Sequence, residues 1–283
     1  MSDPLLTADF VERGYNNRAA VADHPHWLAQ YPELSAGTRA RHRHLLDLRY
    51  GPGPLQTVDL FLPERMPGGT FVFIHGGYWR ALDKADFHFV AGPLLEQGIA
   101  VAVANYDLCP AVSIAKIVDQ CRQLMVWIAR QGPRHGVPAD NVVVGGHSAG
   151  GHLAAMMLAT DWEALGLTRD PLVGGVTLSG VHDLKPLVLS SMNSDLRLTN
   201  AEAARISPVN HVSLSPAPML VAVGGAETSE FIRQAQLLWD AWPENAQPAA
   251  GPLIVAGRHH FNVVVDHADP ESDLTRATLA LFR

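Results

Sequence analysis

The chain has 283 residues, of which 47% are hydrophobic and 17% charged, and its formal net charge is −7 without any run of lysine or arginine. This balance predicts a globular protein with a large core and excludes a long disordered tract. Without a basic stripe, nucleic acid and acidic membrane surfaces are poor candidate partners.

The N-terminal residues and the hydropathy of the chain argue against secretion and membrane insertion. Residues 1–10 contain two acids and a proline instead of an apolar signal-peptide centre, and no later stretch reaches membrane-spanning length. The two cysteines, Cys109 and Cys121, form neither a disulfide framework nor a zinc or redox motif. We therefore expect a cytoplasmic protein with buried free cysteines.

Short runs rich in β-forming residues predict eight strands. They cover residues 45–50, 57–62, 70–74, 99–105, 141–144, 175–178, 219–223 and 253–256. The later runs are apolar without alternation, as expected for parallel strands covered on both faces. The run 57–61 alternates polar and apolar residues, which predicts a half-exposed edge hairpin with the run 45–50.

Between the strands, three segments have helical spacing of apolar residues: 113–130, 149–160 and 229–242. Ser113 is the expected N-cap of the first. The alternation of strands and helices predicts an α/β fold with a mostly parallel eight-stranded sheet and helices on both faces. We interpret residues 1–283 as a single domain, in which 1–44 form an N-terminal lid or cap and 181–215 a possible second lid.

Two strands run directly into tight glycine turns that carry reactive groups. After 142–144 the chain reads Gly146-His147-Ser148-Ala149-Gly150, a G-x-S-x-G pattern, and after 70–74 it reads His75-Gly76-Gly77. The first pattern predicts a nucleophile elbow that exposes Ser148 Oγ, because only small residues fit two positions either side of such a turn. We expect the N–H groups of Gly76, Gly77 and Ala149 to form an oxyanion hole.

A serine hydroxyl needs a base and an acid that orients the base. In hydrolases built on this elbow the acid and then the histidine follow the serine in the chain. Glu227 follows the strand 219–223 and His260 follows 253–256, so we assign them as acid and base. Asp183 is the alternative acid and His259 the alternative base.

Several other residues invite a functional interpretation. Tyr78 and Trp79 beside the glycine turn, together with Tyr15 and Trp162, are candidate walls of a substrate pocket. His75 is expected to hold the turn by hydrogen bonds. The pairs His24/His26 and His42/His44 lack acidic or cysteine partners, so no metal site is predicted. The glycines around Ser148 do not form G-x-G-x-x-G, which argues against a dinucleotide site. No cofactor is expected.

At these residues the chain resembles a known group, the serine hydrolases of the α/β-hydrolase fold, and within it the arylformamidase (kynurenine formamidase) branch. The segment His75-Gly76-Gly77-Tyr78-Trp79 is similar to the H-G-G-x-W signature of that branch, whereas hormone-sensitive-lipase-like esterases usually carry H-G-G-G. Further similar stretches are residues 15–18, 146–152, 179–187 and 230–234. The resemblance implies hydrolysis of N-formylkynurenine to kynurenine and formate without a metal or organic cofactor, and activity on small aryl esters.

The chain departs from the branch at the acid, where Glu227 stands in place of the usual Asp. Three hypotheses follow for function. The first is a serine hydrolase of a small aryl formamide, amide or ester. The second is a general carboxylesterase of the hormone-sensitive-lipase type. The third is a non-catalytic hydrolase fold that binds a small ligand. The oligomeric state stays open, with a homodimer as one option.

Overall fold

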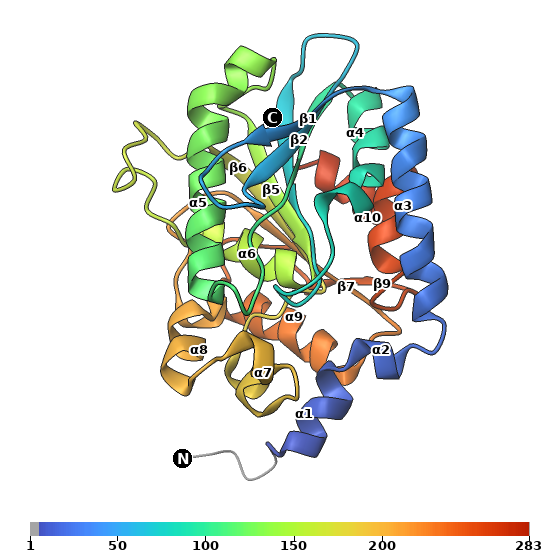
Figure 1. Ribbon diagram of the computed structural model, residues 1–283, viewed down its shortest axis with the longest axis vertical. Helices are drawn as coiled ribbons and strands as arrows, with labels where there is room; N and C mark the ends of the chain where they lie inside the picture. Colours follow the sequence, from blue (N-terminus) through green and yellow to red (C-terminus); the bar gives the residue numbers. More distant parts are fainter. Residues whose placement is uncertain (1–5, 283) are drawn as a thin grey trace.

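The computed structural model describes residues 6–282, and its centre is one mixed β-sheet (Figure 1). In these residues nine strands pair in the order β1-β2-β4-β3-β5-β6-β7-β8, with β9 also paired to β7. The strands are β1 (Arg43–Arg49), β2 (Thr57–Leu62), β3 (Gly69–Ile74), β4 (Ile99–Ala104), β5 (Val142–His147), β6 (Leu172–Leu178), β7 (Met219–Gly224), β8 (Ala246–Gln247) and β9 (Leu253–Val255). The predicted α/β class with a mostly parallel sheet is confirmed, and the two-residue β8 is the one strand beyond the eight predicted.

The helices surround this sheet. They are α1 (Ala8–Tyr15), α2 (Asn17–Ala20), α3 (His24–Arg41), α4 (Gly92–Glu96), α5 (Ile114–Gln131), α6 (Ala149–Leu158), α7 (Asn193–Leu196), α8 (Asn200–Ile206), α9 (Ser229–Ala241) and α10 (Asp273–Leu279). Six short 3-10 helices occur in the described residues: η1 (Lys84–Asp86), η2 (His88–Ala91), η3 (Gly132–His135), η4 (Lys185–Leu189), η5 (Pro208–Asn210) and η6 (Val263–Ala268). The three predicted helices correspond to α5, α6 and α9. Ser113 caps α5 as expected, because its Oγ accepts the N–H of Lys116 at 3.2 Å.

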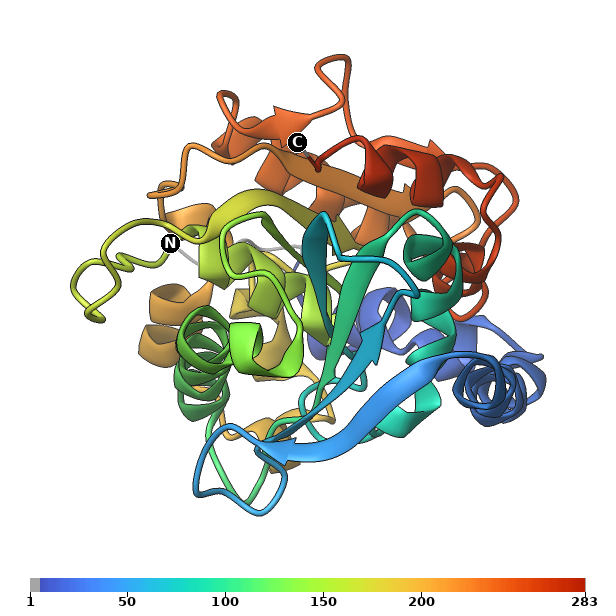
Figure 2. The ribbon, with the colours of Figure 1, turned by 90° about the horizontal axis from the view of Figure 1, so that it is seen from above.

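Alternation along the central strands divides the core between the two faces of the sheet. In β3, Val72 and Ile74 join a cluster with α5, α6 and α9, whereas Phe71 and Phe73 join a second cluster with α3, α4 and α10. Figure 2 shows the helices of the two layers on opposite sides of the twisted sheet. Since both faces are covered, the central strands are buried throughout, as their unbroken apolar runs predict.

The first hairpin is antiparallel as predicted, but the expected half-exposed position of β2 is wrong. β1 forms the edge of the sheet, and β2 lies between β1 and β4. Asp59, the polar residue of the alternating pattern, is only 1% exposed. Its carboxylate contacts Lys84 Nζ at 2.9 Å and His88 Nε2 at 2.8 Å, so a buried ion pair takes the place of solvent.

Both segments that break the strand-helix alternation are helical, and they lie side by side. The first contains α1, α2 and α3, and its residues 1–5 lie outside the described residues. The second contains η4, α7, α8 and η5. Ser191 Oγ of the second donates to the Glu12 carboxylate of the first at 3.1 Å, and Figure 1 shows α1 and α7 at the same end of the molecule.

Candidate active site

The turn between β5 and α6 has the geometry of a nucleophile elbow. Ser148 sits between strand and helix with φ +58° and ψ −119°, a strained conformation for a residue with a side chain. A Cβ on Gly150 would lie 1.9 Å from the Ile74 carbonyl oxygen, and one on Gly146 would lie 2.3 Å from the Gly150 backbone. Only glycine fits at these two positions, which explains the G-x-S-x-G pattern.

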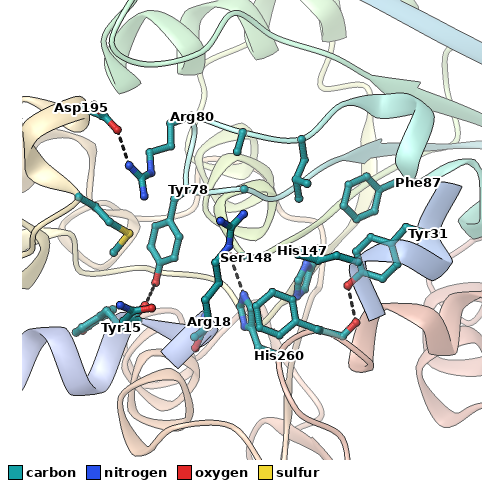
Figure 3. A pocket seen from close by; sticks show the side chains of 18 of the residues that line it. Tyr15, Arg18, Tyr31, Tyr78, Arg80, Phe87, His147, Ser148, Asp195 and His260 are labelled. Carbon is teal, nitrogen blue, oxygen red and sulfur yellow. Dashed lines mark hydrogen bonds and ion pairs between the residues drawn. The ribbon is translucent and has the colours of Figure 1, made fainter. Parts of the chain in front are cut away.

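The structure brings Ser148, His260 and Glu227 together in one hydrogen-bonded chain. Ser148 Oγ lies 3.0 Å from His260 Nε2, and His260 Nδ1 lies 2.7 Å from Glu227 Oε2 (Figure 3 shows the first of these contacts). A carboxylate only accepts hydrogen bonds, so Nδ1 donates to Glu227 and Nε2 is left to accept the serine proton. The arrangement can therefore activate a serine hydroxyl as a nucleophile.

The second oxygen of Glu227 is also held. Oε1 accepts the backbone N–H of Gly224 at 2.9 Å and the hydroxyl of Ser179. The Glu227 side chain is fully buried. These contacts hold the Glu227 carboxylate in one orientation toward His260.

Neither alternative residue enters this chain. The Asp183 carboxylate accepts the N–H of Lys185 at 3.0 Å within its own loop. The His259 ring accepts the N–H of Phe261 at 3.2 Å and packs edge-on against Trp27. The geometry thus favours Glu227 and His260 over Asp183 and His259.

The glycine turn after β3 lies against the elbow. A Cβ on Gly76 would approach Ser148 Cβ to 3.1 Å, and one on Gly77, which has φ +105°, would lie 2.1 Å from the Ala81 carbonyl oxygen. Ala149 is the first residue of α6. In the described part of the chain, the N–H groups of Gly76, Gly77 and Ala149 have no backbone acceptor outside regular helix and strand pairing. They are available to a ligand bound at Ser148.

His75 holds this turn from behind, as the sequence predicts. Its Nδ1 lies 2.7 Å from the Gly76 carbonyl oxygen, and its ring stacks on Tyr106 with centroids 4.4 Å apart. The Tyr106 hydroxyl donates to the His75 carbonyl at 2.9 Å. Complete burial lowers the pKa of His75 below its usual value, so the ring is neutral and supports the turn by hydrogen bonding.

A cavity of about 380 Å³ opens above Ser148 (Figure 3). It is lined by side chains of the N-terminal segment, of the loop after β3, of the 181–215 segment and of the turn at His260. Its aromatic and aliphatic wall consists of Tyr15, Leu28, Tyr31, Tyr78, Leu82, Phe87, Met192 and Phe261. Such a wall suits a flat aromatic ligand.

Two of the four predicted pocket residues line this cavity and two do not. Tyr15 and Tyr78 do, and the Tyr78 hydroxyl donates to the Tyr15 carbonyl at 2.6 Å. Trp79 and Trp162 are not among the lining residues and belong to the hydrophobic core instead, at 0% and 3% exposure. Trp79 has φ +56° and packs edge-on against His152. The neighbouring side chains Tyr78 and Trp79 therefore lie on different sides of the turn. The H-G-G-x-W motif alone does not predict which of them faces the cavity.

Several other wall residues could be predicted from the sequence only as members of a lid segment. Leu28 and Tyr31 come from the 1–44 segment, and Met192 and Asp195 from the 181–215 segment. The sequence signal for these residues was the break in strand-helix alternation. It identified the segments and not the side chains that face the site.

His147, beside the serine, is a neutral neighbour of the candidate base. Its ring centroid lies 4.6 Å from that of His260. Burial, and then the proximity of His260, hold the pKa of His147 well below its usual value. Among the described residues, His260 is the histidine whose ring nitrogen lies within hydrogen-bond distance of Ser148 Oγ.

Residues 6–282 contain no group of three or more His, Cys, Asp or Glu side chains arranged to hold a metal ion. Within the same residues, every helix is too short or too polar to cross a bilayer.

Comparisons with known proteins agree with this fold. The BD-FAE family model matches residues 58–167. Kynurenine formamidase of Salmo salar is 31% identical over 88% of this chain and 86% of its own, and that of Danio rerio is 30% identical over 90% and 88%. The crystal structure of a "putative thioesterase" from Silicibacter sp. TM1040 superposes with a TM-score of 0.80, at 38% identity over 94% of this chain and 97% of its own. The chain is thus a hydrolase of the α/β fold, and it belongs to the kynurenine formamidase family of α/β-hydrolases.

Proposed function

We propose that this protein is a metal-independent serine hydrolase that cleaves a small aryl formamide, of the N-formylkynurenine type, or a related aryl amide or ester. The observation that carries the proposal is the hydrogen-bonded chain Ser148–His260–Glu227 at an aromatic-walled cavity. The family relationship supports the substrate class, since the relatives named above are kynurenine formamidases.

The first half-reaction forms an acyl-enzyme. His260 Nε2 takes the proton of Ser148 Oγ as the oxygen attacks the carbonyl carbon of the substrate. The carbonyl oxygen becomes an oxyanion and accepts hydrogen bonds from the N–H groups of Gly76, Gly77 and Ala149. His260 then gives its proton to the leaving amine as the C–N bond breaks, and the acyl group stays on Ser148.

The second half-reaction regenerates the serine. A water molecule gives one proton to His260 and attacks the acyl carbon, and the same N–H groups hold the second oxyanion. His260 protonates Ser148 Oγ as the acid, formate in the case of a formamide, departs. Glu227 keeps Nδ1 protonated through both steps, so Nε2 is always the nitrogen that exchanges the proton.

The aromatic wall supports an aryl leaving group. Tyr31, Phe87 and Phe261 line the same cavity as Ser148. A formyl group is the smallest acyl group, so most of the roughly 380 Å³ cavity is left for the amine. An aryl ring buried here gains both apolar contact and ring-ring interactions.

The direct test is formate release from N-formylkynurenine by the wild-type protein and by Ser148→Ala. We expect the variant to lose all but about 1/10⁴ or less of the turnover while keeping its melting temperature, because the nucleophile is absent and the fold is not altered. Ser213→Ala, a serine outside the cavity, is the matched control. Retained turnover in Ser148→Ala would refute the assignment of the nucleophile.

Ester hydrolysis is the second candidate function, favoured by the 38% identical relative described as a "putative thioesterase". The ratio of kcat/KM for N-formylkynurenine to that for p-nitrophenyl acetate separates the two. A fluorophosphonate probe addresses the third hypothesis, a non-catalytic fold, since labelling of the wild type but not of Ser148→Ala requires an activated serine.

A further inference from the structure

The tyrosine hydroxyls of the cavity wall are already used within the protein. Tyr31 donates to the Phe261 carbonyl and Tyr78 to the Tyr15 carbonyl. The Tyr15 hydroxyl accepts from Gln234 Nε2 at 2.7 Å and contacts the Glu230 carboxylate. A ligand therefore meets these side chains as ring surfaces and has to find polar partners elsewhere.

Arg18 is the charged wall residue without a partner. Arg80, the other arginine of the wall, forms an ion pair with Asp195, and this pair is neutral as a unit. Within residues 6–282, no hydrogen bond or ion pair joins the Arg18 side chain to another residue, although its backbone lies in α2 beside the site. In Figure 3 the Arg18 guanidinium lies over the cavity, in front of Ser148 in this view. The wall thus carries one uncompensated positive charge.

The neighbouring residue adds a second donor to the same wall. Asn17 lines the cavity, is 4% exposed, and has no acceptor for its Nδ2 within the described residues. A buried amide donor without an acceptor is costly, on the order of 1–3 kcal/mol. A guanidinium and an unsatisfied amide on adjacent residues together favour an acceptor-rich anion.

We propose that Arg18 is a specificity-determining residue that binds a carboxylate of the substrate hydrolysed at Ser148. This inference rests on the proposed function and adds to it the charge of the substrate. Guanidinium and carboxylate form two parallel hydrogen bonds, which fix direction as well as distance. Arg18 is exposed at the cavity, and within the described residues no hydrogen bond or ion pair joins it to Ser148 or His260, so we expect its effect on substrate choice and KM.

The test uses two formanilides that differ only in charge: 4-(2-formamidophenyl)-4-oxobutanoate and its primary carboxamide. The wild-type protein should show a kcat/KM at least about tenfold higher for the carboxylate, most of it through a lower KM. Arg18→Gln should bring the ratio of the two kcat/KM values close to one, and Arg18→Lys should restore part of it. Added NaCl should weaken the preference of the wild type.

Arg13→Gln is the matched control. It removes one positive charge from the same N-terminal segment, but Arg13 pairs with Asp9 on the surface of α1 and does not line the cavity. This variant should keep the wild-type ratio. A wild-type ratio near one, or a ratio in Arg18→Gln equal to that of the wild type, would overturn the proposal for Arg18 while leaving the formamidase proposal intact.

A separate measurement covers the case in which neither formanilide is hydrolysed. The acid 4-oxo-4-phenylbutanoate has no scissile bond, and its binding is measured as protection of Ser148 from a fluorophosphonate. Stronger protection in the wild type than in Arg18→Gln supports the carboxylate site even if the proposed substrate is wrong. Equal protection in the two proteins contradicts it.

Discussion

At the scale of single residues, Glu227 is held more completely than orientation of one imidazole requires. One oxygen faces His260 Nδ1 at 2.7 Å, and the other accepts from Gly224 N–H and from the Ser179 hydroxyl. Ser179 itself has φ +53° and is fully buried, so its hydroxyl is firmly placed. These contacts fix the long glutamate side chain in the orientation that its hydrogen bond to His260 needs.

Replacing either candidate acid by its amide separates the two assignments. We expect Glu227→Gln to lower kcat about 10³- to 10⁴-fold, because the amide can donate to Nδ1 and favours the wrong imidazole tautomer. Asp183→Asn makes the same chemical change in a carboxylate that contacts only its own loop, and it should leave kcat close to the wild-type value. Steady-state kinetics on N-formylkynurenine decides; a larger loss in Asp183→Asn would mean that the acid is misassigned.

Sequence reasoning located the residues of the Ser–His–Glu chain better than the residues of the cavity. Ser148, Glu227 and His260 each follow an apolar strand, so their position depends on local pattern and chain order. The cavity wall depends on which side of a turn faces inward. The Trp79 side chain lies in the core, whereas that of its neighbour Tyr78 lines the cavity. Nothing in the order of residues distinguishes these two outcomes.

At the scale of elements, a buried charge cluster joins the first hairpin to the loop that follows the glycine turn. Lys84 of η1 contacts Asp59 of β2 at 2.9 Å and Asp47 of β1 at 2.7 Å. Although burial opposes it, hydrogen bonds to these two carboxylates raise the pKa of Lys84, so the amine stays charged. The cluster therefore attaches the edge of the sheet to the segment behind the site.

Loss of Lys84 should destabilise the fold. Lys84→Met leaves the Asp59 carboxylate buried without its cation, which costs about 3–5 kcal/mol of unfolding free energy in comparable pairs. Asp47→Asn removes the other carboxylate, whose side chain is 74% exposed, and should cost less than about 1 kcal/mol. Urea unfolding followed by circular dichroism measures both. Equal effects of the two substitutions would contradict the role given to burial.

The same cluster shows why the hairpin was only partly predicted. Antiparallel pairing follows from the alternating run 57–61, the neighbouring run 45–50 and the Gly-Pro turn between them. Burial of Asp59 depends on Lys84 and His88, which come from a different segment. Likewise, β8 is only two residues long and is defined by its pairing with β7, so a local sequence pattern could not predict it.

At the scale of the whole molecule, the strand-helix core supplies the chemistry and the two added segments supply the walls. Ser148, Glu227 and His260 all follow strands of the parallel sheet. Tyr15, Arg18 and Tyr31 come from the N-terminal segment, and Met192 from the 181–215 segment. This division predicts that relatives with the same core and different added segments share the reaction and differ in substrate.

Buried neutral histidines are distributed through this molecule and couple its stability to pH. Burial lowers the pKa of His152 and His267 to about 4 and that of His182 to about 3, from an ordinary value of 6.5. Well above pH 6.5 these rings are neutral in both the folded and the unfolded chain. At lower pH the unfolded chain binds protons that the folded chain excludes.

The free energy of unfolding should therefore fall as the pH is lowered from about 6.5 toward 4, with a limiting slope of about 1.4 kcal/mol per pH unit for each of these histidines. Burial raises the pKa of Asp86 and Asp266, so at the acidic end of this range the folded chain binds protons there more readily than the unfolded chain does. This opposes the fall in the free energy of unfolding. Urea unfolding is therefore most informative at pH 7, 6 and 5. The glutamine in His152→Gln keeps a donor for the Ile206 carbonyl but cannot titrate. The slope of this variant should therefore be smaller than that of the wild type by up to about 1.4 kcal/mol per pH unit, the contribution of one histidine. His26→Gln makes the same substitution at an exposed position of α3 and is the matched control. A slope in His152→Gln identical to that of the wild type would show that His152 is not excluded from protonation by the fold.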